Sequence, residues 1–434
     1  MILVGTFLLM TPAAAAGAPL GFVDALFTAT SATCVTGLVV VDTGTALSPF
    51  GQAVVLVLIQ VGGLGIMTYS SIFLLALGRR LSFRGEALLE DTIGRRERTS
   101  VGQLVRDVVL FTLAIEAVAA LLLAGAFART LPAAEALYHG LFHSVSAFCN
   151  AGFSLYSASL TEHRGSWWVN GTVIGLVTLG GLGFVVLEDL KGAWADWRAG
   201  RAVRLRLHSK VVLAGTLVLT VAGTAGIWLF ERGNALTGLP PGEALLACLF
   251  QAVTPRTAGF NTLDYAGLTH TTLLLTLLLM FVGANPGSCG GGIKVTTAAL
   301  VAALFRDRLL GRRRISLFRR TVPDPTVARA VTILLASFLF ATAAVFGLLA
   351  LEVGPVPHTA AGGAFLDYFF EVVSAFGTVG LSTGVTPSLS PPGRLLLTAV
   401  MFAGRLGPLT LAMAVGMREE RDRVSYAQEN LMVG

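Results

Sequence analysis

Four short segments of this 434-residue chain carry one pattern of small and polar residues around a single glycine. They align without gaps as SATCVTGLVV from Ser31, SAFCNAGFSL from Ser146, VTPRTAGFNT from Val253 and SAFGTVGLST from Ser374. The aligned glycines are Gly37, Gly152, Gly259 and Gly380. Glycine adopts backbone angles that other residues avoid, so successive carbonyl oxygens can turn toward one point and replace the hydration shell of a cation. The pattern predicts cation coordination by the backbone.

The coordinating carbonyls are expected in each segment at the glycine and the two residues before it. The side chains at these positions differ widely while the glycine recurs, as expected if backbone oxygens do the coordination. The alternative is that these are ordinary glycine turns between helices. The candidate filter residues are Val35, Thr36, Gly37, Asn150, Ala151, Gly152, Thr257, Ala258, Gly259, Thr378, Val379 and Gly380.

A second element recurs about 24 to 28 residues after each glycine, in the same order four times. Its copies are VGGLG from Val61, LGGLG from Leu179, VGANPG from Val282 and AGRLG from Ala403. Each glycine segment also follows a stretch too short to cross a membrane. Re-entrant backbone at membrane depth is tolerated where it is buried in protein or lines a water-filled path. We therefore expect an all-α integral membrane protein with four tandem repeats around a pseudo-fourfold central pore. Each repeat consists of an outer helix, a pore helix with its filter loop, and an inner helix.

Composition excludes a water-soluble enzyme, because 54% of the residues are hydrophobic, only 13% are charged and the mean hydropathy is +0.75. Windows long enough to span a bilayer lie near residues 50–78, 105–128, 167–188, 211–230, 271–284 continuing past a glycine-rich break to 305, 327–351 and 394–417. Residues 2–10 are interpreted as the end of a first outer helix that is short or truncated. The predicted units are 1–78, 79–191, 192–306 and 307–417, followed by the tail 418–434.

The basic residues are concentrated on one side of the predicted membrane. The segments 79–107, 189–210, 306–329 and 418–429 hold 24 of the 31 Lys and Arg, which predicts that they face the cytoplasm. The net charge of +6 is then explained by orientation in the membrane, and no nucleic-acid partner is expected. The opposite loops hold ten acids that would concentrate cations at the mouth of the pore, or that simply solvate the loops: Asp24, Asp42, Glu135, Glu162, Glu231, Glu243, Asp264, Glu352, Asp367 and Glu371.

The third inner helix is interrupted at 283–294 by a stretch dense in glycine that also contains Pro286. Such a composition does not sustain a helix. It suits a flexible flap below the filter, with a passive kink as the alternative. The candidate gate residues are Gly283, Asn285, Pro286, Gly287, Ser288, Gly290, Gly291, Gly292 and Lys294, together with Arg405 from the fourth inner helix.

Two arginines at membrane depth need a reason, because ionisable groups there are costly. Arg405 takes the place of Gly63 in the repeated VGGLG element, so it is expected to face the pore just inside the filter. A structural pair between helices is the alternative. Arg256 lies three residues before Gly259 and is expected to brace the filter loop, since a cation at the coordinating ring would repel cations.

Several chemical motifs are excluded. The four cysteines have no metal-ligand spacing and indicate neither a zinc site nor a disulfide framework. The glycine-rich stretch before Lys294 lacks the GK[ST] of a phosphate-binding loop. Gly380 to Gly384 fits the GxSxG pattern by letter but lies in a repeated pore loop. The chain is therefore predicted to be no enzyme and to hold no organic cofactor.

With these residues in view, the sequence resembles the Trk/Ktr/HKT superfamily of potassium-translocating subunits, and most of all the bacterial KtrB type. The match covers nearly the whole chain. It rests on SATCVTGLVVVDTGT, IQVGGLGIMTY, SAFCNAGFSLY, QAVTPRTAGFNTLDY, GGGIKVTT, SAFGTVGLSTG and MFAGRLGPLTLA.

The resemblance implies K⁺ as the transported ion, because in that family glycine in all four filter positions goes with K⁺ preference. It implies that 283–294 is the gate and that Arg405 is a barrier to ions and a partner of that loop. It further implies a homodimer with contacts from the tail 426–434 and a cytoplasmic nucleotide-binding ring of RCK type. Na⁺ or H⁺ is a candidate coupled ion. The expected location is the bacterial plasma membrane, with the filter loops facing outside. Membrane lipids are the other partner expected for the basic segments.

Two other function classes compete with a pore. A secondary transporter with alternating access usually shows two inverted halves, whereas the repeats here run in one orientation. A membrane scaffold or receptor subunit would not need four filter loops. Cation flux separates these classes.

Overall fold

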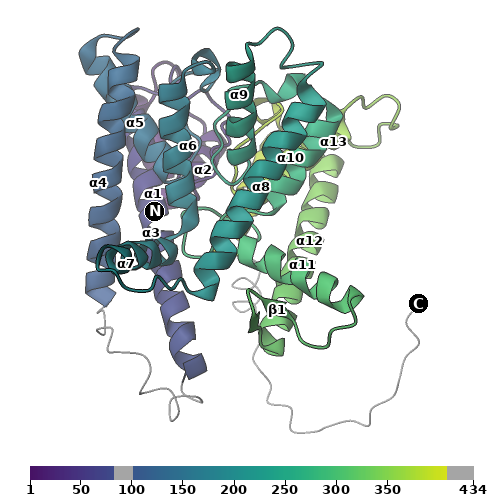
Figure 1. The fold of residues 1–434 in the computed structure, drawn as a ribbon. Helices are drawn as coiled ribbons and strands as arrows, with labels where there is room; N and C mark the ends of the chain where they lie inside the picture. Colours follow the sequence, from purple (N-terminus) through teal and green to yellow (C-terminus); the bar gives the residue numbers. More distant parts are fainter. Residues whose placement is uncertain (83–100, 408–434) are drawn as a thin grey trace.

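The computed structural model describes residues 1–82 and 101–407, and most of that chain is helical (Figure 1). The α-helices of its first half are α1 Ile2–Leu9, α2 Phe22–Thr33, α3 Pro49–Ser82, α4 Val101–Phe127, α5 Ala133–Phe148, α6 Trp167–Leu182 and α7 Phe184–Arg198. Those of the second half are α8 Leu207–Glu231, α9 Pro241–Val253, α10 His270–Phe281, α11 Val295–Leu309, α12 Asp324–Glu352, α13 Ala364–Gly377 and α14 Pro391–Leu406.

The remaining elements are short. A hairpin of β1 Ser316–Leu317 and β2 Arg320–Thr321 pairs antiparallel after α11. Single 3₁₀ turns are η1 Pro12–Ala14, η3 Thr161–His163, η4 Tyr265–Gly267 and η5 Thr386–Ser388. The predicted tail contact at 426–434 lies outside the described residues, as does most of the basic segment between α3 and α4.

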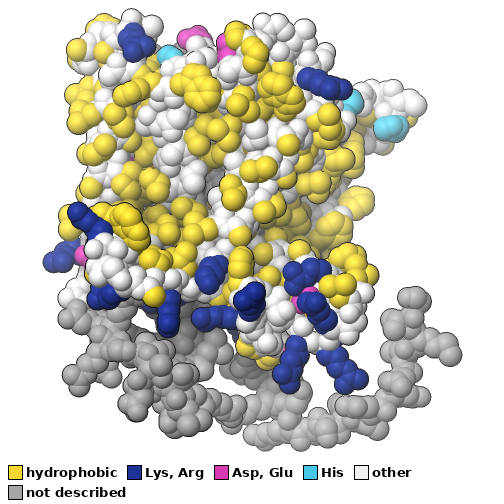
Figure 2. All heavy atoms as spheres, in the orientation of Figure 1, with side chains coloured by type: hydrophobic (Ala, Val, Ile, Leu, Met, Phe, Trp, Pro, Cys, Tyr) yellow, Lys and Arg dark blue, Asp and Glu magenta, His cyan; other side chains and the backbone are white. Residues whose placement is uncertain are grey.

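The long helices are those of an integral membrane protein. Three helices in the described residues are long and apolar enough to cross a bilayer, Val105–Phe127, Leu207–Glu231 and Asp324–Glu352, and a fourth span arises if α6 and α7 are taken together. Less than half of each of these three windows is buried, so they present apolar side chains outward, as a lipid-facing helix does. Figure 2 shows this as a broad hydrophobic band, with Lys and Arg gathered at the lower end.

Four shorter helices, α2, α5, α9 and α13, form the interior. Each lies between two hydrophobic clusters, and the clusters link them in a closed cycle. One joins α2 to α5 through Ala29 and Phe142, the next joins α5 to α9, the third joins α9 to α13, and the last returns from α13 to α2 through Phe376 and Phe27. The cycle places the ends of the four short helices around one centre.

Three of the helices that follow these short helices pack through glycine. A side chain at Gly62 of α3 would collide with the carbonyl of Thr33, and one at Gly180 of α6 with the carbonyl of Phe148. Gly404 of α14 stands in the same relation to Phe376. The repeated glycine of the VGGLG element is therefore the point where each helix closes on the end of a short helix.

One predicted span contains a sharp bend. Within the window 167–188, α6 ends at Leu182 and α7 starts at Phe184 with a bend of 101°. Gly183 between them has φ 87°, which glycine adopts without strain. The hydropathy of the window does not report this turn. Helix α7 consequently runs across the ends of the upright helices (Figure 1).

Candidate functional site

The four glycine segments hang from the C-terminal ends of α2, α5, α9 and α13 and share one backbone conformation. Their glycines have φ values of 95°, 71°, 79° and 89°. The residue two positions earlier is also left-handed in every segment, although none of the four is glycine: Val35, Asn150, Thr257 and Thr378. The residue between does not have positive φ. We call the segments 35–37, 150–152, 257–259 and 378–380 the glycine loops.

The glycines of the four loops touch in a closed ring. A Cβ at Gly37 would lie 3.1 Å from the Cα of Gly152, and one at Gly152 would lie 2.8 Å from the Cα of Gly259. A Cβ at Gly259 would lie 3.4 Å from the Cα of Gly380, and one at Gly380 would return within 2.9 Å of Gly37. The order around the ring is the order along the sequence.

Carbonyl oxygens stand between neighbouring glycines. The carbonyl of Ala151 lies beside Gly37 and that of Thr36 lies beside Gly380. The carbonyls of Ala258 and Val379 lie beside Gly152 and Gly259 in the same sense. Any side chain on a ring glycine would therefore collide with these oxygens, which explains why the four positions are all glycine.

Hydroxyl groups at the ends of the short helices form hydrogen bonds with the backbone at or just after each glycine loop. Ser31 Oγ donates to the carbonyl of Leu38 at 2.7 Å, and Ser146 Oγ donates to that of Phe153 at 2.8 Å. Thr254 Oγ1 makes the equivalent bond in the third segment, to Phe260, at 2.5 Å. In the fourth, Ser374 Oγ accepts from the backbone N–H of Gly380 at 3.1 Å. The sequence analysis did not assign these residues a role, although each stands at or near the start of its repeated segment: Ser31, Ser146, Thr254 and Ser374.

Two opposite loops carry a further brace. His143 Nε2 of α5 lies 3.0 Å from Ser154 Oγ. In the fourth segment Ser382 Oγ donates to the carboxylate of Glu371, which also accepts from Thr386 Oγ1 at 2.8 Å. Glu371 was expected among the loop acids that concentrate cations or solvate the loops. It is instead fully buried within α13, where these hydroxyl donors replace water around its carboxylate.

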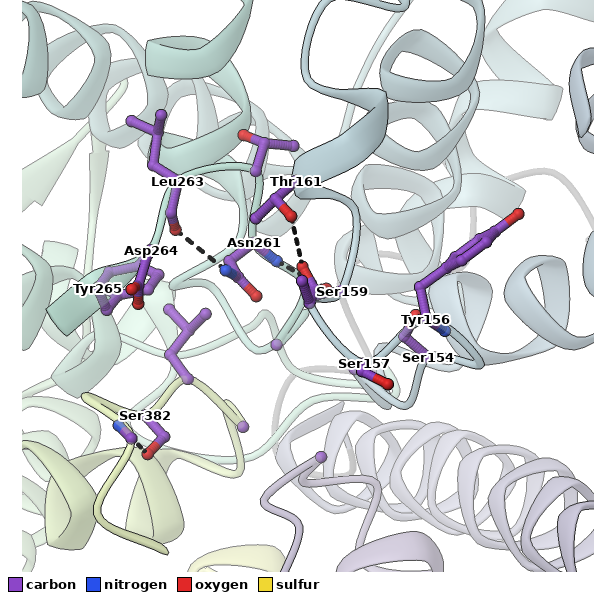
Figure 3. Close-up of a pocket in the computed structure, with 18 of the residues that line it drawn as sticks. Ser154, Tyr156, Ser157, Ser159, Thr161, Asn261, Leu263, Asp264, Tyr265 and Ser382 are labelled. Atoms are coloured by element: carbon purple, nitrogen blue, oxygen red, sulfur yellow. Dashed lines mark hydrogen bonds between the residues drawn. The ribbon is translucent and has the colours of Figure 1, made fainter. Parts of the chain in front are cut away.

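The ring of glycines forms the floor of a vestibule of about 740 Å³. All four glycines line it, and its walls come from the chain that follows each loop. Figure 3 shows these walls as mostly polar side chains around Ser159, Asn261 and Ser382. The Asn261 N–H donates to Ser159 Oγ at 3.2 Å, which joins the walls of the second and third segments.

The ten acids of the loops opposite the basic segments have different surroundings. Some are engaged by protein partners: Asp24 with Arg394, Glu243 with Arg164, Glu231 with Thr269, and Glu352 with Ser390. Glu231, also expected among these loop acids, is fully buried at the end of α8. Asp42 and Asp264 line the vestibule. About half of the ten predicted acids therefore form hydrogen bonds or ion pairs with protein groups.

Asp42 is held ionised by its surroundings. Partial burial alone would raise its pKa, but hydrogen bonds from the Ser157 hydroxyl and from Thr45, whose N–H donates at 2.8 Å, outweigh burial and lower the pKa from 3.8. The vestibule thus keeps a fixed negative charge near its wall at neutral pH.

The glycine-rich segment between α10 and α11, residues 282–294, lies directly against the ring from the other side. The N–H of Gly291 donates to Thr378 Oγ1 at 2.9 Å. A side chain at Gly290 would collide with the hydroxyl of Thr257. As the composition predicts, no helix crosses this stretch, and Val282 forms only an isolated bridge with Ile293. We call 282–294 the intramembrane loop.

A buried arginine and a half-buried lysine bond to carbonyls of this loop. Arg405 Nη1 donates to the carbonyl of Cys289, and its Nη2 donates to the carbonyl of Gly62 at 3.1 Å. The guanidinium therefore bridges the loop and α3 from its place on α14. Lys294 Nζ turns back on the loop and donates to the carbonyl of Gly290 at 2.6 Å.

Arg256 is placed away from the vestibule. Its side chain is 7% exposed, and Nη2 donates to Thr216 Oγ1 of α8 at 3.0 Å. It is not among the residues that line the vestibule. The geometry attaches the third glycine segment to α8, and the arginine does not face the ring.

The TrkH model, described as a cation transport protein, matches residues 2–425 of this chain. The chain belongs to the TrkH family. It is 38% identical to Ktr system potassium uptake protein B of Bacillus subtilis (strain 168), with 100% of this chain and 94% of that protein aligned. It is 39% identical to the protein of the same name from Vibrio alginolyticus, over 96% of this chain and 89% of the relative.

Further comparisons agree with this family. The chain is 34% identical to potassium/sodium uptake protein NtpJ of Enterococcus hirae, over 100% of this chain and 95% of the relative. The crystal structure of the potassium transporter TrkH from Vibrio parahaemolyticus has the same fold, with a TM-score of 0.70 at 20% identity over 92% of this chain and 79% of that one. Membership in a transporter family agrees with the prediction that the chain is not an enzyme.

Proposed function

We propose that this chain is the K⁺-translocating subunit of a bacterial K⁺ uptake system, in which backbone carbonyls of the four glycine loops select the ion. The observation that carries the proposal is the closed ring of four left-handed glycines with a carbonyl oxygen beside each one, at the floor of a polar vestibule. The names of the Bacillus and Vibrio relatives, both potassium uptake proteins, support the choice of ion.

The proposed path begins at the vestibule, where Asp42 and Asp264 attract cations. K⁺ then sheds water against the carbonyls of residues 35–37, 150–152, 257–259 and 378–380. The intramembrane loop obstructs the path below the ring, and Arg405 adds a positive charge and a tether there. Movement of the loop would open the path.

The same proposal includes the assembly and its setting. The units 1–78, 79–191, 192–306 and 307–417 form one pore in the bacterial plasma membrane, with the glycine loops facing outside. A homodimer with contacts from 426–434 and a cytoplasmic RCK-type nucleotide-binding ring complete the system. Deleting 426–434 should reduce the dimer fraction in native mass spectrometry. The name of the Enterococcus relative makes Na⁺ a candidate coupled ion.

A flux assay in liposomes tests the proposal. The chain should carry K⁺ and Rb⁺ faster than Na⁺, and a chain that carries no cation would contradict the proposal. Gly37→Ser, which places a side chain against the Ala151 carbonyl, should lower the preference for K⁺ over Na⁺. Gly171→Ser is the matched control, because a Cβ at Gly171 in α6 meets nothing within 4 Å. Repeating the assay with and without Na⁺ separates Na⁺-dependent uptake from passive passage.

A further inference from the structure

Helix α7 is largely buried in its first half and exposed in its second half. Its first turns pack inside, where Val186 and Leu187 meet Val212 of α8. Its second half exposes two large aromatic side chains, Trp194 at 55% and Trp197 at 67%. More than half of the surface of each tryptophan is therefore left uncovered by the described protein.

Basic residues share the face of these tryptophans. Lys191, Trp194 and Trp197 recur at intervals of three residues, which places them on one side of a helix. Arg198 lies on the same side, four residues after Trp194. The guanidinium of Arg198 lies 4.7 Å from the centre of the Trp194 ring. Tryptophan beside Lys or Arg is the combination found where a protein meets lipid headgroups.

The depth of α7 fits a membrane surface. Helix α6 has 16 residues, so it is about 24 Å long, close to the hydrocarbon thickness of about 30 Å. Trp167 and Trp168 are exposed at its start, and Trp194 and Trp197 lie beyond its end. The two pairs match the two aromatic belts of a membrane protein. Figures 1 and 2 place α7 in the band of Lys and Arg at the lower end of the molecule.

The corner where α7 begins is fastened to the intramembrane loop. The N–H of Phe184 donates to the carbonyl of Gly287 at 3.1 Å, and Asn285 Nδ2 donates to the carbonyl of Gly181 at 2.8 Å. A side chain at Gly183 would collide with the carbonyl of Pro286. The Phe184 ring also shares a small apolar cluster with Cys289. A tilt of α7 cannot leave this loop unmoved.

We propose that α7 binds anionic phospholipid headgroups of the leaflet on the basic side, and that the lipid-bound position of α7 sets the position of the intramembrane loop. The phosphates would pair with Lys191, Arg198 and the exposed Arg201, whose guanidinium also contacts the carboxylate of Asp196 at 2.8 Å. The two indoles would lie at headgroup level. The binding part stands independently, whereas the coupling part rests on the proposed function of the loop as a gate. Anionic lipid then regulates ion flux through the corner at Gly183.

Tryptophan fluorescence tests the binding. The variant Trp167→Phe, Trp168→Phe, Trp228→Phe leaves Trp194 and Trp197 as the only tryptophans, since the chain has five. Brominated phosphatidylglycerol should quench this variant about twofold more strongly than brominated phosphatidylcholine. Adding Lys191→Gln, Arg198→Gln and Arg201→Gln should remove the difference.

A matched variant removes three charges elsewhere on the basic side: Arg308→Gln, Arg313→Gln and Arg314→Gln. It should keep the preference for phosphatidylglycerol. Equal quenching by the two lipids in the tryptophan variant would overturn headgroup binding. Absence of quenching by either lipid would overturn it too, and would mean that protein covers α7.

Flux in the same liposomes tests the coupling. The unaltered chain should change its K⁺ flux about threefold as phosphatidylglycerol replaces phosphatidylcholine, a change of under 1 kcal/mol in the barrier. The variant without the α7 charges should lose this dependence, and the matched variant should keep it. A clear quenching preference with lipid-independent flux would overturn the coupling alone. No K⁺ flux in any lipid would overturn the proposed function and the coupling, while the quenching result would still decide lipid binding.

Discussion

The helices that follow the four glycine loops invite comparison. In three of them, one glycine closes the helix on the end of a short helix: Gly62 on Thr33, Gly180 on Phe148 and Gly404 on Phe376. After the third glycine loop, at the end of α10, the corresponding Gly283 instead meets the carbonyl of Gly291 within the intramembrane loop. All four glycine loops keep the same backbone angles, and each has a hydroxyl from the end of its short helix bonded to its backbone. Under the proposed function, the repeated part holds the ion and the exceptional part moves.

The largest effect is expected at the symmetric ring. Gly380→Ala forces a side chain onto the Thr36 carbonyl at a φ of 89°, so the ring must distort. We expect K⁺ flux in liposomes to fall about 100-fold, or about 2.7 kcal/mol in the barrier. Gly384→Ala is the control, because its φ of 97° is similar but a Cβ there meets nothing within 4 Å. Equal losses in both variants would assign the effect to local strain and not to the ring.

The exceptional region should respond in the opposite direction. Deleting 287–291 shortens the intramembrane loop and removes its contact with Thr378. We expect K⁺ flux to rise about tenfold, a decrease of about 1.4 kcal/mol in the barrier. Deleting 356–360, which are exposed between α12 and α13, should leave flux unchanged. Unchanged flux after the first deletion would favour a passive kink over a gate.

Arg405 distinguishes a tether from a simple charge barrier. Arg405→Ala removes both the bonds to Cys289 and Gly62 and the positive charge, and we expect flux to rise about fivefold. Arg405→Lys keeps the charge but cannot reach both carbonyls with one planar group, so we expect a rise of about twofold. If neither variant changes flux while thermal stability falls, the arginine is only a structural link between helices.

The smallest effect is expected at the vestibule wall. Because the pKa of Asp42 is lowered, its carboxylate stabilises the fold above its unfolded-state pKa, and this contribution is lost as pH falls through the lower folded pKa. The carboxylate also stays ionised from about pH 5 to 8 and attracts cations over that whole range. Asp42→Asn should therefore weaken the apparent K⁺ affinity about twofold at every pH in this range. The effect should shrink in high concentrations of an impermeant salt. A pH-dependent difference in that range would assign the titration to another group.

The sequence predicted the parts of the structure that repeat. The four loops, the short helices before them and the break at 283–294 all follow from composition and spacing, because glycine density and the lengths of apolar runs directly limit the backbone. The division of the chain into four units and the role of each candidate residue stay predictions. The position of Arg405 within the fourth copy of the VGGLG element could also be read by alignment, whereas its bond to Gly62 could not.

What the sequence could not predict depends on contacts across turns. The hydroxyls of Ser31 and Ser374 reach their partners only after the loop has folded back. The bend at Gly183 depends on the carbonyls of the intramembrane loop, a segment about 100 residues later. Glu371 was misplaced because a carboxylate in a short amphiphilic stretch has the composition of a loop, and only its three-dimensional donors make its burial tolerable.

The cycle of hydrophobic clusters has a consequence for biosynthesis. The last cluster joins α13 to α2, so the cycle closes only when residues 364–377 have left the ribosome and inserted beside residues 22–33. Until then three glycine loops lack a fourth neighbour, and the end of α2 has one open flank. This chain therefore cannot complete its central ring unit by unit during synthesis. A nascent chain that stops before α13 leaves the apolar flank of α2 uncovered, which makes such an intermediate prone to aggregation.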